Sequence, residues 1–528
     1  MGTPGNVKAE VDVPVLIVGG GAVGLAASIL LSRLGVRHLL VESRAHSKRH
    51  PRSAGVNTRT MEILRPWGIE QRLREAAVAV PDGNLLVWAE SLAGQELNRS
   101  TVEALATADV QPDSPTTSCF FAEDTLEPIL ARCARAQAPA EIRFECLLDY
   151  FEQDAEGVEA AVCNLESGIE TRLRARWMIA ADGAAGASRE RLQIPLQGAT
   201  DASNVISIHC RTNLRSLTTG RQAIRYSVRS PAVEGDFIPV SELDRWLFNL
   251  PFDPETESVA DYDLERCVQL VRAGAGLPGL PVEVLGIEAW RVDAGLAERY
   301  RGGSVFLIGD AAHRIPSVSS LAVNTGIEDA QNLAWKLAAV LNGAPEELLD
   351  SFEVERRPVA EAAIDRGMAQ LKSLVQLRRP TSKMDRRRRP RKMARPEPAP
   401  ELGARAPHVW LWRDGARLST LDLFEARLTL LAGPGGGEWV KAARAINQPA
   451  LELTALTVGT AGDLEDRNGS FLAAYRLEPG GAVLVRPDGR LAWRGGGGAA
   501  SPAEELDAAC RDLLLQRAGA SRPALTAK

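Results

Sequence analysis

The hydrophobic pattern at the start of the chain changes its period twice. An apolar run at 13–18 is typical of a buried strand, apolar positions at helical spacing extend over 22–34, and a second short apolar run covers 38–42. Glycines separate the first run from the helical stretch. This order predicts a strand, a helix and a second strand, which together form a βαβ unit of an α/β protein.

The pattern then becomes mixed up to about residue 200. It predicts helices at 58–67 and 124–136, a short strand at 143–146 and a run that ends at 177–183. Farther along the chain, a buried strand at 303–310 is followed by a long helical pattern at 326–342. These stretches extend the α/β part of the protein.

Residues from about 203 to 296 have a different pattern. Runs such as 205–210 and 245–250 alternate between apolar and polar positions, which predicts antiparallel strands with one face turned to a core. We therefore expect a sheet-based second domain at 201–296, inserted between a first domain formed by 1–200 and 297–377. Part of the inserted sheet is expected within 80–125.

The end of the chain is set apart by charge. Residues 378–395 hold ten Lys or Arg against one acidic residue, with two prolines inside. This is typical of a linker, here 378–400; nucleic-acid binding is the alternative, but no aromatic residues interleave the charges. Residues 401–528 form a further domain.

Composition narrows the class of protein. Of the 528 residues, 45% are hydrophobic and 25% are charged, and the net charge is -6, which gives no overall attraction to nucleic acid or to an anionic membrane. Seven cysteines with no C-x-x-C pair favour a reducing compartment. The acids Glu10 and Asp12 argue against a signal peptide, and glycines interrupt the uncharged stretch at 13–32. We predict a cytoplasmic protein.

The first strand and helix enclose a G-x-G-x-x-G pattern. Gly19 permits a tight turn, Gly21 lets a pyrophosphate approach the helix N-terminus, and Gly24 lets the helix and strand pack closely. Glu42 ends the second strand, where a carboxylate binds ribose hydroxyls and repels a 2′-phosphate. The pattern predicts bound FAD or NAD, not NADP.

A second motif favours the flavin. Asp310 follows the buried strand at 303–310, and Asn324 opens the long helix. A carboxylate at a strand end can bind the ribityl hydroxyls of a flavin, while a helix N-terminus stabilises negative charge on its pyrimidine ring. NAD has no ribityl chain, so we predict FAD.

With these motifs the chain resembles the FAD-dependent aromatic hydroxylases of the para-hydroxybenzoate hydroxylase type, and among them the hydroxylases of aromatic polyketide biosynthesis in actinobacteria. The resemblance covers nearly the whole chain. It rests on the glycine pattern and on five further stretches: Arg52 with Arg59 in 51–62, Leu126 to Leu130, Asp182-Gly183 with Arg189, Gly309-Asp310, and parts of 405–489.

The resemblance implies a fold. It is an α/β protein with a Rossmann-like FAD-binding domain, an inserted antiparallel-sheet substrate domain and a C-terminal thioredoxin-like domain. The C-terminal domain has only Cys510, so thioredoxin-type redox chemistry is excluded and a structural or dimerisation role is favoured. The oligomeric state is left open between monomer and homodimer.

The resemblance also implies roles for residues. Glu42 would bind the adenosine ribose, Asp310 the ribityl chain, and Val323 with Asn324 the pyrimidine edge of the flavin. Asp182 would be shared between FAD and the reductant, NADPH or NADH, which docks transiently. Around the phosphates and the ring, the implied contacts are Gly19, Gly21, Val23, Gly24, Arg52, Glu123, Pro316 and Ala322.

The loop before the long helix departs from the family. Where the family reads Arg-x-Pro-Pro-x-Gly-Gly-x-Gly-x-Asn, residues 314–324 lack the second proline and all three glycines. Ser319, Ser320 and Ala322 add side-chain atoms beside the reactive edge of the flavin. Three hypotheses follow: ordinary hydroxylation with a shifted loop, a flavoprotein with Baeyer-Villiger, rearranging or non-oxygenating chemistry, or a non-redox cyclase or binding protein.

Other polar and aromatic residues are weighed individually. His313 is interpreted as a packing or capping residue rather than a proton carrier, and His209 and Cys210 as wall or core residues rather than metal ligands. Arg225 or Arg245 would stabilise a substrate phenolate. The aromatic residues that either line a pocket or lie in a core are Tyr226, Trp246 and Trp290.

The sequence thus predicts a flavin-dependent monooxygenase. Its flavin C4a-hydroperoxide transfers oxygen to a bulky phenolic aromatic polyketide, with O2 and a nicotinamide as co-substrates and with no metal, nucleic acid or membrane. Ser319, Ser320 and Arg225 are the candidate residues beside the reaction.

Overall fold

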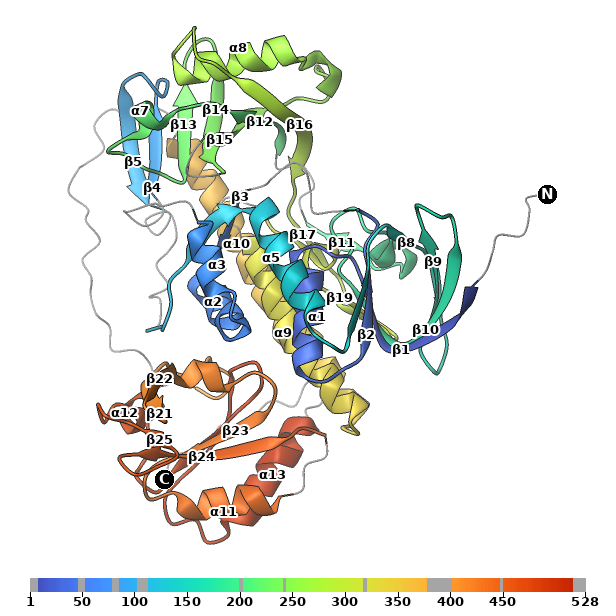
Figure 1. Cartoon of the computed structure of the whole chain (residues 1–528), viewed down its shortest axis with the longest axis vertical. Helices are drawn as coiled ribbons and strands as arrows, with labels where there is room; N and C mark the ends of the chain where they lie inside the picture. The colour runs from blue at the N-terminus through green and yellow to red at the C-terminus, as the bar shows by residue number, and fades with distance from the viewer. Residues whose placement is uncertain are drawn as a thin grey trace.

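The structure is a computed structural model of the 528-residue chain. It describes residues 8–45, 53–77, 85–101, 113–198, 203–240, 244–316, 321–377, 401–446 and 450–515. Each of three parts is built around a sheet, and we call them the N-terminal, middle and C-terminal domains (Figure 1). The middle and C-terminal domains lie at opposite ends of the N-terminal domain (Figure 1).

The N-terminal domain is built on a largely parallel sheet with the order β18-β19-β10-β1-β2-β7, to which β9 and β8 add an antiparallel extension. Helix α1 packs between this sheet and α9, so its apolar residues are buried on several sides. The strands of this domain are β1 (Lys8–Val18), β2 (His38–Val41), β3 (Ser53–Val56), β6 (Cys119–Ala122), β7 (Ala140–Arg143), β8 (Cys146–Gln153), β9 (Val158–Asn164), β10 (Glu170–Ala180), β11 (Leu196–Gln197), β17 (Gly295–Ala297), β18 (Arg301–Gly302), β19 (Val305–Leu307) and β20 (His313–Arg314).

Helices surround the N-terminal sheet, and the two longest run beside each other (Figure 1). The helices are α1 (Ala22–Arg33), α2 (Thr58–Leu64), η1 (Arg65–Trp67), α3 (Glu70–Glu75), α5 (Glu123–Arg135), α6 (Ala187–Arg191), η3 (Gly309–Ala311), α9 (Leu321–Leu341), η4 (Glu346–Asp350) and α10 (Ser351–Leu377).

The middle domain is a seven-stranded sheet with the order β16-β12-β15-β14-β13-β4-β5. One face forms a core with α8, in which Phe237 and Phe248 stack at 4.1 Å between ring centroids. Its elements are β4 (Leu85–Ala89), β5 (Glu96–Thr101), β12 (Ser203–Arg211), α7 (Arg215–Thr218), β13 (Arg225–Arg229), β14 (Glu234–Pro239), β15 (Arg245–Pro251), η2 (Val259–Asp261), α8 (Leu264–Ala275) and β16 (Glu283–Val292).

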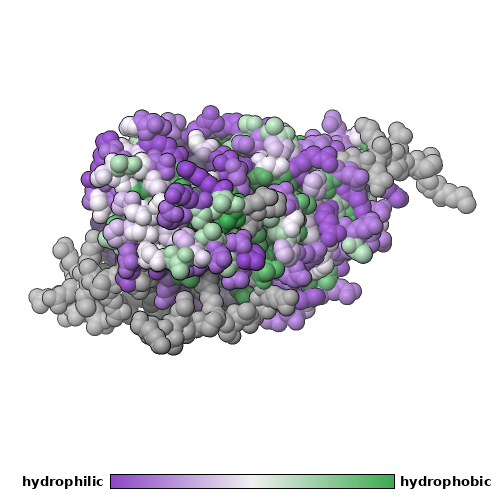
Figure 2. Space-filling model, turned by 90° about the horizontal axis from the view of Figure 1, so that it is seen from below, coloured by the Kyte–Doolittle hydropathy of each residue, from purple (hydrophilic) through white to green (hydrophobic). Residues whose placement is uncertain are grey.

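The C-terminal domain is a seven-stranded sheet with the order β22-β21-β25-β24-β23-β26-β27, and α11 and α13 pack together on it. Its elements are β21 (Trp410–Arg413), β22 (Ala416–Ser419), η5 (Thr420–Leu423), β23 (Leu428–Ala432), α11 (Gly437–Ala445), β24 (Leu453–Gly459), β25 (Leu464–Glu465), α12 (Phe471–Tyr475), β26 (Ala482–Val485), β27 (Leu491–Gly495) and α13 (Pro502–Leu514). Seen from below, the molecule carries mainly hydrophilic side chains, with hydrophobic ones gathered in a small area near the middle of this view (Figure 2).

Many apolar side chains of the C-terminal domain form a shared core with Trp335 of α9.

Ion pairs fasten the C-terminal domain to the N-terminal domain. The Arg486 guanidinium donates to both carboxylate oxygens of Glu355 on α10, at 2.8 and 2.7 Å, and also contacts Asp488. Nearby, Arg405 Nε donates to Glu62 Oε2 at 2.8 Å. A bidentate Arg–carboxylate contact is the strongest geometry for such a pair, so these contacts fix how the two domains meet.

This interface predicts an acid-sensitive stability. Burial alone would raise the pKa of Glu355 and Asp488, but Lys336 and Arg486 hold the pKa of Glu355, and Arg486 that of Asp488, below the ordinary range. Their stabilisation is present above the unfolded-state pKa of about 4 and is lost as the pH falls through the lower folded-state values. We expect the urea midpoint to fall between pH 7 and pH 3.5.

A variant at Glu355 isolates the contribution of its carboxylate to the pH dependence of stability. Glu355→Gln should lower the urea midpoint at pH 7, because Arg486 and Lys336 lose their charged partner, and should then show a shallower decline toward pH 3.5. A decline as steep as that of the unchanged protein would show that other carboxylates set the acid sensitivity.

Several predicted elements differ from the observed ones in their bounds. The strand predicted at 143–146 falls on the connection between β7, which ends at Arg143, and β8, which begins at Cys146. Glu145 in this connection has a φ of 55°, which is not compatible with a continuous strand. The long helix begins at Leu321, five residues before the predicted start at 326, because Leu321, Ala322 and Val323 fit a helix and continue its first turn. The predicted linker at 378–400 lies outside the described residues. Among the described residues, no helix is both long and apolar enough to cross a membrane.

Candidate active site

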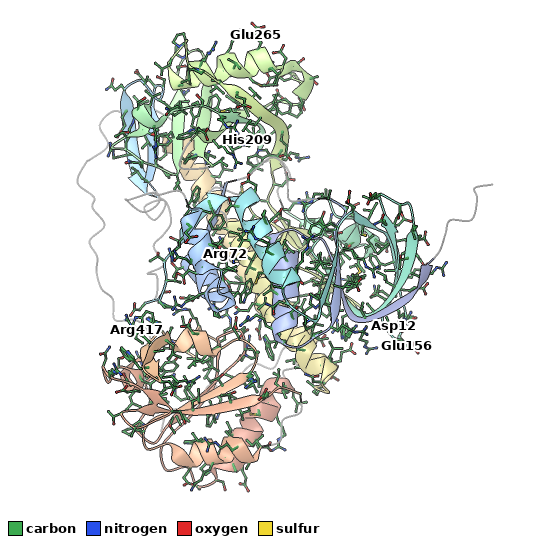
Figure 3. All side chains as sticks on the ribbon, in the orientation of Figure 1. Asp12, Arg72, Glu156, His209, Glu265 and Arg417 are labelled. Atoms are coloured by element: carbon green, nitrogen blue, oxygen red, sulfur yellow. The ribbon has the colours of Figure 1, made fainter. Side chains whose placement is uncertain are left out.

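One cleft of about 1140 Å³ runs between the N-terminal and middle domains. Its N-terminal wall includes the glycine turn after β1, Glu42 at the end of β2, Asp310 after β19 and the start of α9. Its other wall is the face of the middle sheet that is turned away from α8. His209, on β12, lies where the two domains approach each other (Figure 3). The two walls thus share one continuous space.

The glycine turn has the close approaches that its sequence predicts. Gly19 has a φ of 106°, and a Cβ there would overlap the carbonyl oxygen of Ala181. A Cβ at Gly24 would overlap the carbonyl oxygen of Gly19, whereas at Gly21 the nearest neighbour would be Glu127 Oε1 at 3.6 Å. Gly19 and Gly24 therefore serve the packing of strand on helix, and Gly21 keeps the N-terminus of the twelve-residue helix α1 open toward the cleft.

Glu42 is 6% exposed and is held from two sides. Its carboxylate accepts hydrogen bonds from the Gly20 N–H at 2.6 Å and from the backbone N–H and Nε of Arg44, both at 2.8 Å. Burial alone would raise the pKa of Glu42, but these donors and the charge of Arg44 hold it below its ordinary value. The carboxylate is therefore ionised at neutral pH and able to accept further hydrogen bonds.

Val23 joins the glycine turn to the second motif. A Cβ added at Gly309 would lie 3.2 Å from the Val23 side chain, and a Cβ added at Gly326 would lie 2.6 Å from it. Helix α1 therefore packs directly against the end of β19 and the first turns of α9. Asp310, the next residue after Gly309, lines the cleft, and its carboxylate makes no hydrogen bond to another described residue.

A buried charge network supports this junction from behind. Asp329 Oδ2 contacts His313 Nε2 at 2.7 Å and accepts from the Gly309 N–H at 3.3 Å. Its Oδ1 accepts from Arg356 Nε at 2.7 Å, and Arg356 also donates to the carbonyl oxygen of Thr325 at 3.1 Å. Burial alone would raise the pKa of Asp329, but Arg356 and His313 hold it low. His313 is thus fully buried and bonded within this network, which agrees with its interpretation as a packing residue.

The start of α9 reaches the cleft through Ala322 and Val323. Asn324 points elsewhere: its Oδ1 accepts from the Asn57 N–H at 2.9 Å, and its Nδ2 donates to the carbonyl oxygen of Gly55 at 3.0 Å. Its amide thus fastens α9 to β3. Asn324 is not among the residues that line the cleft.

Pro316 is buried but does not line the cleft. Its carbonyl oxygen lies 3.0 Å from the position of a Cβ at Gly367 of α10. The candidates Arg52, Ser319 and Ser320 lie outside the described residues, and Glu123 begins α5 with a side chain that also lies outside them.

Asp182 lies at the end of β10 and is folded inward. Its Oδ2 accepts from the Ser188 N–H at 3.0 Å, and burial raises its pKa. The carboxyl group occupies the space that a Cβ at Gly186 would need, and its Oδ1 is buried without a hydrogen-bond partner among the described residues. Asp182 and the residues from Gly183 to Ser188 line the same part of the cleft.

These features fit a bound FAD. The cleft has an open helix N-terminus at Gly21 for a pyrophosphate, an ionised acceptor at Glu42 and, at Asp310, a carboxylate that no other described residue hydrogen-bonds. It also has the first turn of the 21-residue helix α9 beside Ala322 and Val323. These donors and acceptors match the groups that a dinucleotide with a ribityl chain presents.

The middle wall holds a buried ion pair. Arg225 contacts Asp236, which is 3% exposed and also accepts a hydrogen bond from the Ser227 hydroxyl. Arg225 lines the cleft, as its proposed role requires, whereas Arg245 contacts Asp124 of α5 and donates to His209 at 3.3 Å. Arg245 therefore joins the two domains and is not part of the middle wall.

The three aromatic candidates separate into two groups. Tyr226 and Trp246 are buried in the core against α8, with ring centroids 6.0 Å apart. Trp290 lines the cleft. Adjacent positions of a strand point to opposite faces, so Tyr226 is buried while its neighbour Arg225 faces the cleft.

The polar residues of the cleft that were not among the predicted site residues include four that bear on the site. Arg44 and Glu127 lie beside the glycine turn, and Asp236 and Asn249 lie on the middle wall. A signal for Asn249 exists in the sequence, since it is the polar position of the alternating run at 245–250. For Asp236 a comparable signal appears only once the strands are aligned, because its neighbours come from other strands.

Comparison with known proteins identifies the class. The family model of the FAD binding domain matches residues 12–367, and that of the aromatic-ring hydroxylase C-terminal region matches residues 399–516. The chain therefore belongs to the family of FAD-dependent aromatic-ring hydroxylases, and the family predicted from the sequence is confirmed.

Individual relatives narrow the comparison. Tetracenomycin A2 monooxygenase-dioxygenase of Streptomyces glaucescens is 36% identical, with 96% of this chain and 98% of that protein covered. The crystal structure of the flavin-dependent monooxygenase PieE with FAD and substrate has a TM-score of 0.84 and 30% identity, with 96% of this chain and 99% of that chain covered. That of aklavinone-11 hydroxylase with FAD and aklavinone has a TM-score of 0.82 and 32% identity, with 96% and 100% covered. The chain is thus similar over nearly its whole length to flavin-dependent monooxygenases and hydroxylases.

Proposed function

We propose that this protein is an FAD-dependent monooxygenase that hydroxylates a phenolic aromatic polyketide, with NADPH or NADH as a transient reductant and O2 as the oxygen source. The observation that carries the proposal is the continuous cleft of about 1140 Å³, which joins a dinucleotide-binding turn to a wall with both apolar and polar side chains. Relatives that act on, or are bound to, polycyclic compounds support the same substrate class.

Each cofactor contact has a residue to make it. Gly21 and the N-terminus of α1 would hold the pyrophosphate, Glu42 the adenosine ribose, Asp310 the ribityl chain, and the start of α9 at Val323 the pyrimidine edge. When bound, the flavin supplies the electron transfer to oxygen and the delivery of one oxygen atom to the ring. A single G-x-G-x-x-G turn follows a strand in this chain, so a nicotinamide would dock only transiently.

The protein supplies orientation and shelter. Apolar side chains at the middle wall exclude water from the aromatic body of the substrate, and Arg225 is placed to stabilise a phenolate oxygen. Because Asp236 pairs with Arg225, the guanidinium is not an isolated charge, and its Nε, which has no partner among the described residues, can donate to a substrate oxygen. The wall thereby fixes which ring carbon faces the flavin.

We propose that residues 401–528 form a thioredoxin-like domain with a structural role, joined through the linker 378–400 to an FAD-binding domain of 1–200 and 297–377 around a substrate domain of 201–296. The core strand order β24-β23-β26-β27, with β23 parallel to β24 and antiparallel to β26, supports this assignment. Cys510 is buried, and burial raises its pKa to about 12, so it offers no reactive thiolate.

The function is tested first at the ribityl contact. Asp310→Ala should weaken FAD binding about tenfold or more, because the ribityl hydroxyls lose a charged acceptor. Asp154→Ala, which removes a carboxylate outside the cleft, should leave FAD binding unchanged. Fluorescence titration of the apoprotein with FAD measures both, and equal affinities would remove Asp310 from the site.

The reaction itself is tested with labelled oxygen. Protein loaded with FAD, supplied with NADPH and a hydroxylated anthraquinone under ¹⁸O2, should give a product that carries one labelled oxygen atom. Oxidised product without label would show non-oxygenating oxidation instead. Failure to retain FAD would show that the flavin assignment is wrong.

A further inference from the structure

A row of polar side chains crosses the middle sheet on the face that lines the cleft. The register pairs each member with the next across β13, β14, β15, β12 and β16. In that order the members, which we call the polar row, are Ser227, Asp236, Asn249, Ser207 and Glu288. Neighbouring members stand one strand apart, which is about 4.8 Å in any sheet. The row therefore presents polar groups at a regular spacing across the sheet, along a line that follows the twist of the strands.

The polar row is not needed to build the sheet. The residues that alternate with it, among them Phe237, Phe248 and Ile208, form the core with α8 on the opposite face. A strand that packs only one face satisfies its fold with those residues alone, and the other face commonly meets solvent. Here the other face lines a cleft, so its polar side chains are available to a ligand.

One atom of the polar row and one atom of the adjacent Arg225 lack hydrogen-bond partners within the described residues. Asn249 Oδ1 and Arg225 Nε are buried and make no hydrogen bond there. Asp236, by contrast, is held by Arg225 and Ser227 and keeps the row in place. A buried polar atom without a partner costs about 1–3 kcal/mol, which a ligand with matching groups would recover.

The neighbouring positions on the same face are mostly apolar. On one side of the row, Val205, Pro251 and Trp290 line the cleft, and on the other side Ile238 and Leu247 do so. The wall is thus a polar line flanked by two short apolar strips, and the strip of Ile238 and Leu247 ends at the charged Arg225 on β13. A molecule that fits it has a flat apolar body and oxygens confined to one edge.

We propose that the polar row binds one oxygenated edge of a flat fused-ring substrate, in which hydroxyl and carbonyl oxygens stand on successive rings of the same side. Oxygens on alternate rings of a linear fused system repeat at about the spacing of neighbouring strands, so they face successive members of the row. The amide of Asn249 and the hydroxyl of Ser207 recognise them, and Arg225 meets the oxygen at the end of the edge. This proposal rests on the proposed function and specifies its substrate class.

A pair of isomeric probes tests the proposal. In 1,8-dihydroxyanthraquinone three oxygens lie along one edge, whereas in 2,6-dihydroxyanthraquinone the hydroxyls lie at opposite corners. Isothermal titration of the FAD-loaded protein should show that the first isomer binds about tenfold or more tightly than the second, since it gains at least one additional hydrogen bond. Equal affinities, or binding of neither isomer, would overturn the proposal.

Variants assign the preference to the polar row. Asn249→Leu, and independently the smaller change Ser207→Ala, should each reduce the preference for the 1,8 isomer severalfold. Leu247→Ala, on the flanking apolar strip, should weaken both isomers alike and leave the preference unchanged. FAD content and circular dichroism confirm that each variant is folded, and a preference that survives both row variants would overturn the assignment.

The readout separates this proposal from the proposed function. Isomer preference is an equilibrium property and needs no turnover. Incorporation of ¹⁸O without isomer preference would overturn only the role of the polar row. Isomer preference without incorporation would overturn the monooxygenase assignment and leave the row as a recognition site.

Discussion

Arg356→Met is expected to lower the free energy of unfolding by about 3 to 5 kcal/mol, because it leaves the Asp329 carboxylate as an uncompensated charge in the interior. Arg356 is 2% exposed and Asp329 is fully buried. The variant also frees the carbonyl oxygen of Thr325 in α9. Because Asp329 holds the Gly309 N–H and His313, the cleft wall around Asp310 should loosen and FAD binding should weaken with the fold.

The neighbouring arginine provides a matched control. Among the described residues, Arg357 makes a single hydrogen bond, from Nε to the carbonyl oxygen of Ala297 at 3.2 Å. Arg357→Met should cost less than about 1.5 kcal/mol and leave FAD binding intact. Urea unfolding followed by circular dichroism, together with FAD titration, measures both variants. Similar losses in the two would contradict the special role assigned to the buried network.

Gly24→Ala is expected to destabilise the protein strongly and to abolish FAD retention. The added Cβ overlaps the carbonyl oxygen of Gly19, which is backbone and cannot rotate away, so α1 must move from the strand on which it packs. Overpacking of this kind costs about 1–3 kcal/mol or more. The displaced helix no longer presents its N-terminus to the pyrophosphate.

Gly21→Ala separates the effect on binding from the effect on folding. Among the described residues its Cβ would have only Glu127 Oε1 within van der Waals distance, at 3.6 Å, so the stability of the apoprotein should be unchanged. The methyl group nevertheless projects toward the space for the pyrophosphate, and FAD affinity should fall. Thermal unfolding of each apoprotein and FAD titration distinguish the two variants. If Gly21→Ala destabilised the apoprotein as much as Gly24→Ala, Gly21 would have a packing role instead.

The parts of the site that sequence alone predicts are those with local causes. Gly19, Gly21 and Gly24 are recognisable because the requirements of one turn act within six residues, and Glu42 follows at the end of the next strand. The same holds for Asp310, which directly follows the short buried strand β19. The family and the FAD cofactor followed from these motifs and are confirmed.

The parts that sequence does not predict depend on which segments become neighbours. Asp236 and Asn249 are opposite each other only because β14 and β15 pair in one register, and a shift by one residue would turn both to the core. The start of α9 was misplaced for a related reason. Asn324 suggested a helix start, but it lies within the first turn of α9. Its amide bonds to Gly55 and Asn57, which lie outside that helix.

The alternation of the middle sheet has a consequence for how specificity can change. Phe237 and Phe248 maintain the fold on one face, and their direct neighbours in sequence, Asp236 and Asn249 of the polar row, lie on the other face. Substitutions at the row therefore alter what the cleft accepts at little cost to the core. A library restricted to Ser207, Asn249 and Glu288 would explore new substrates on an unchanged scaffold.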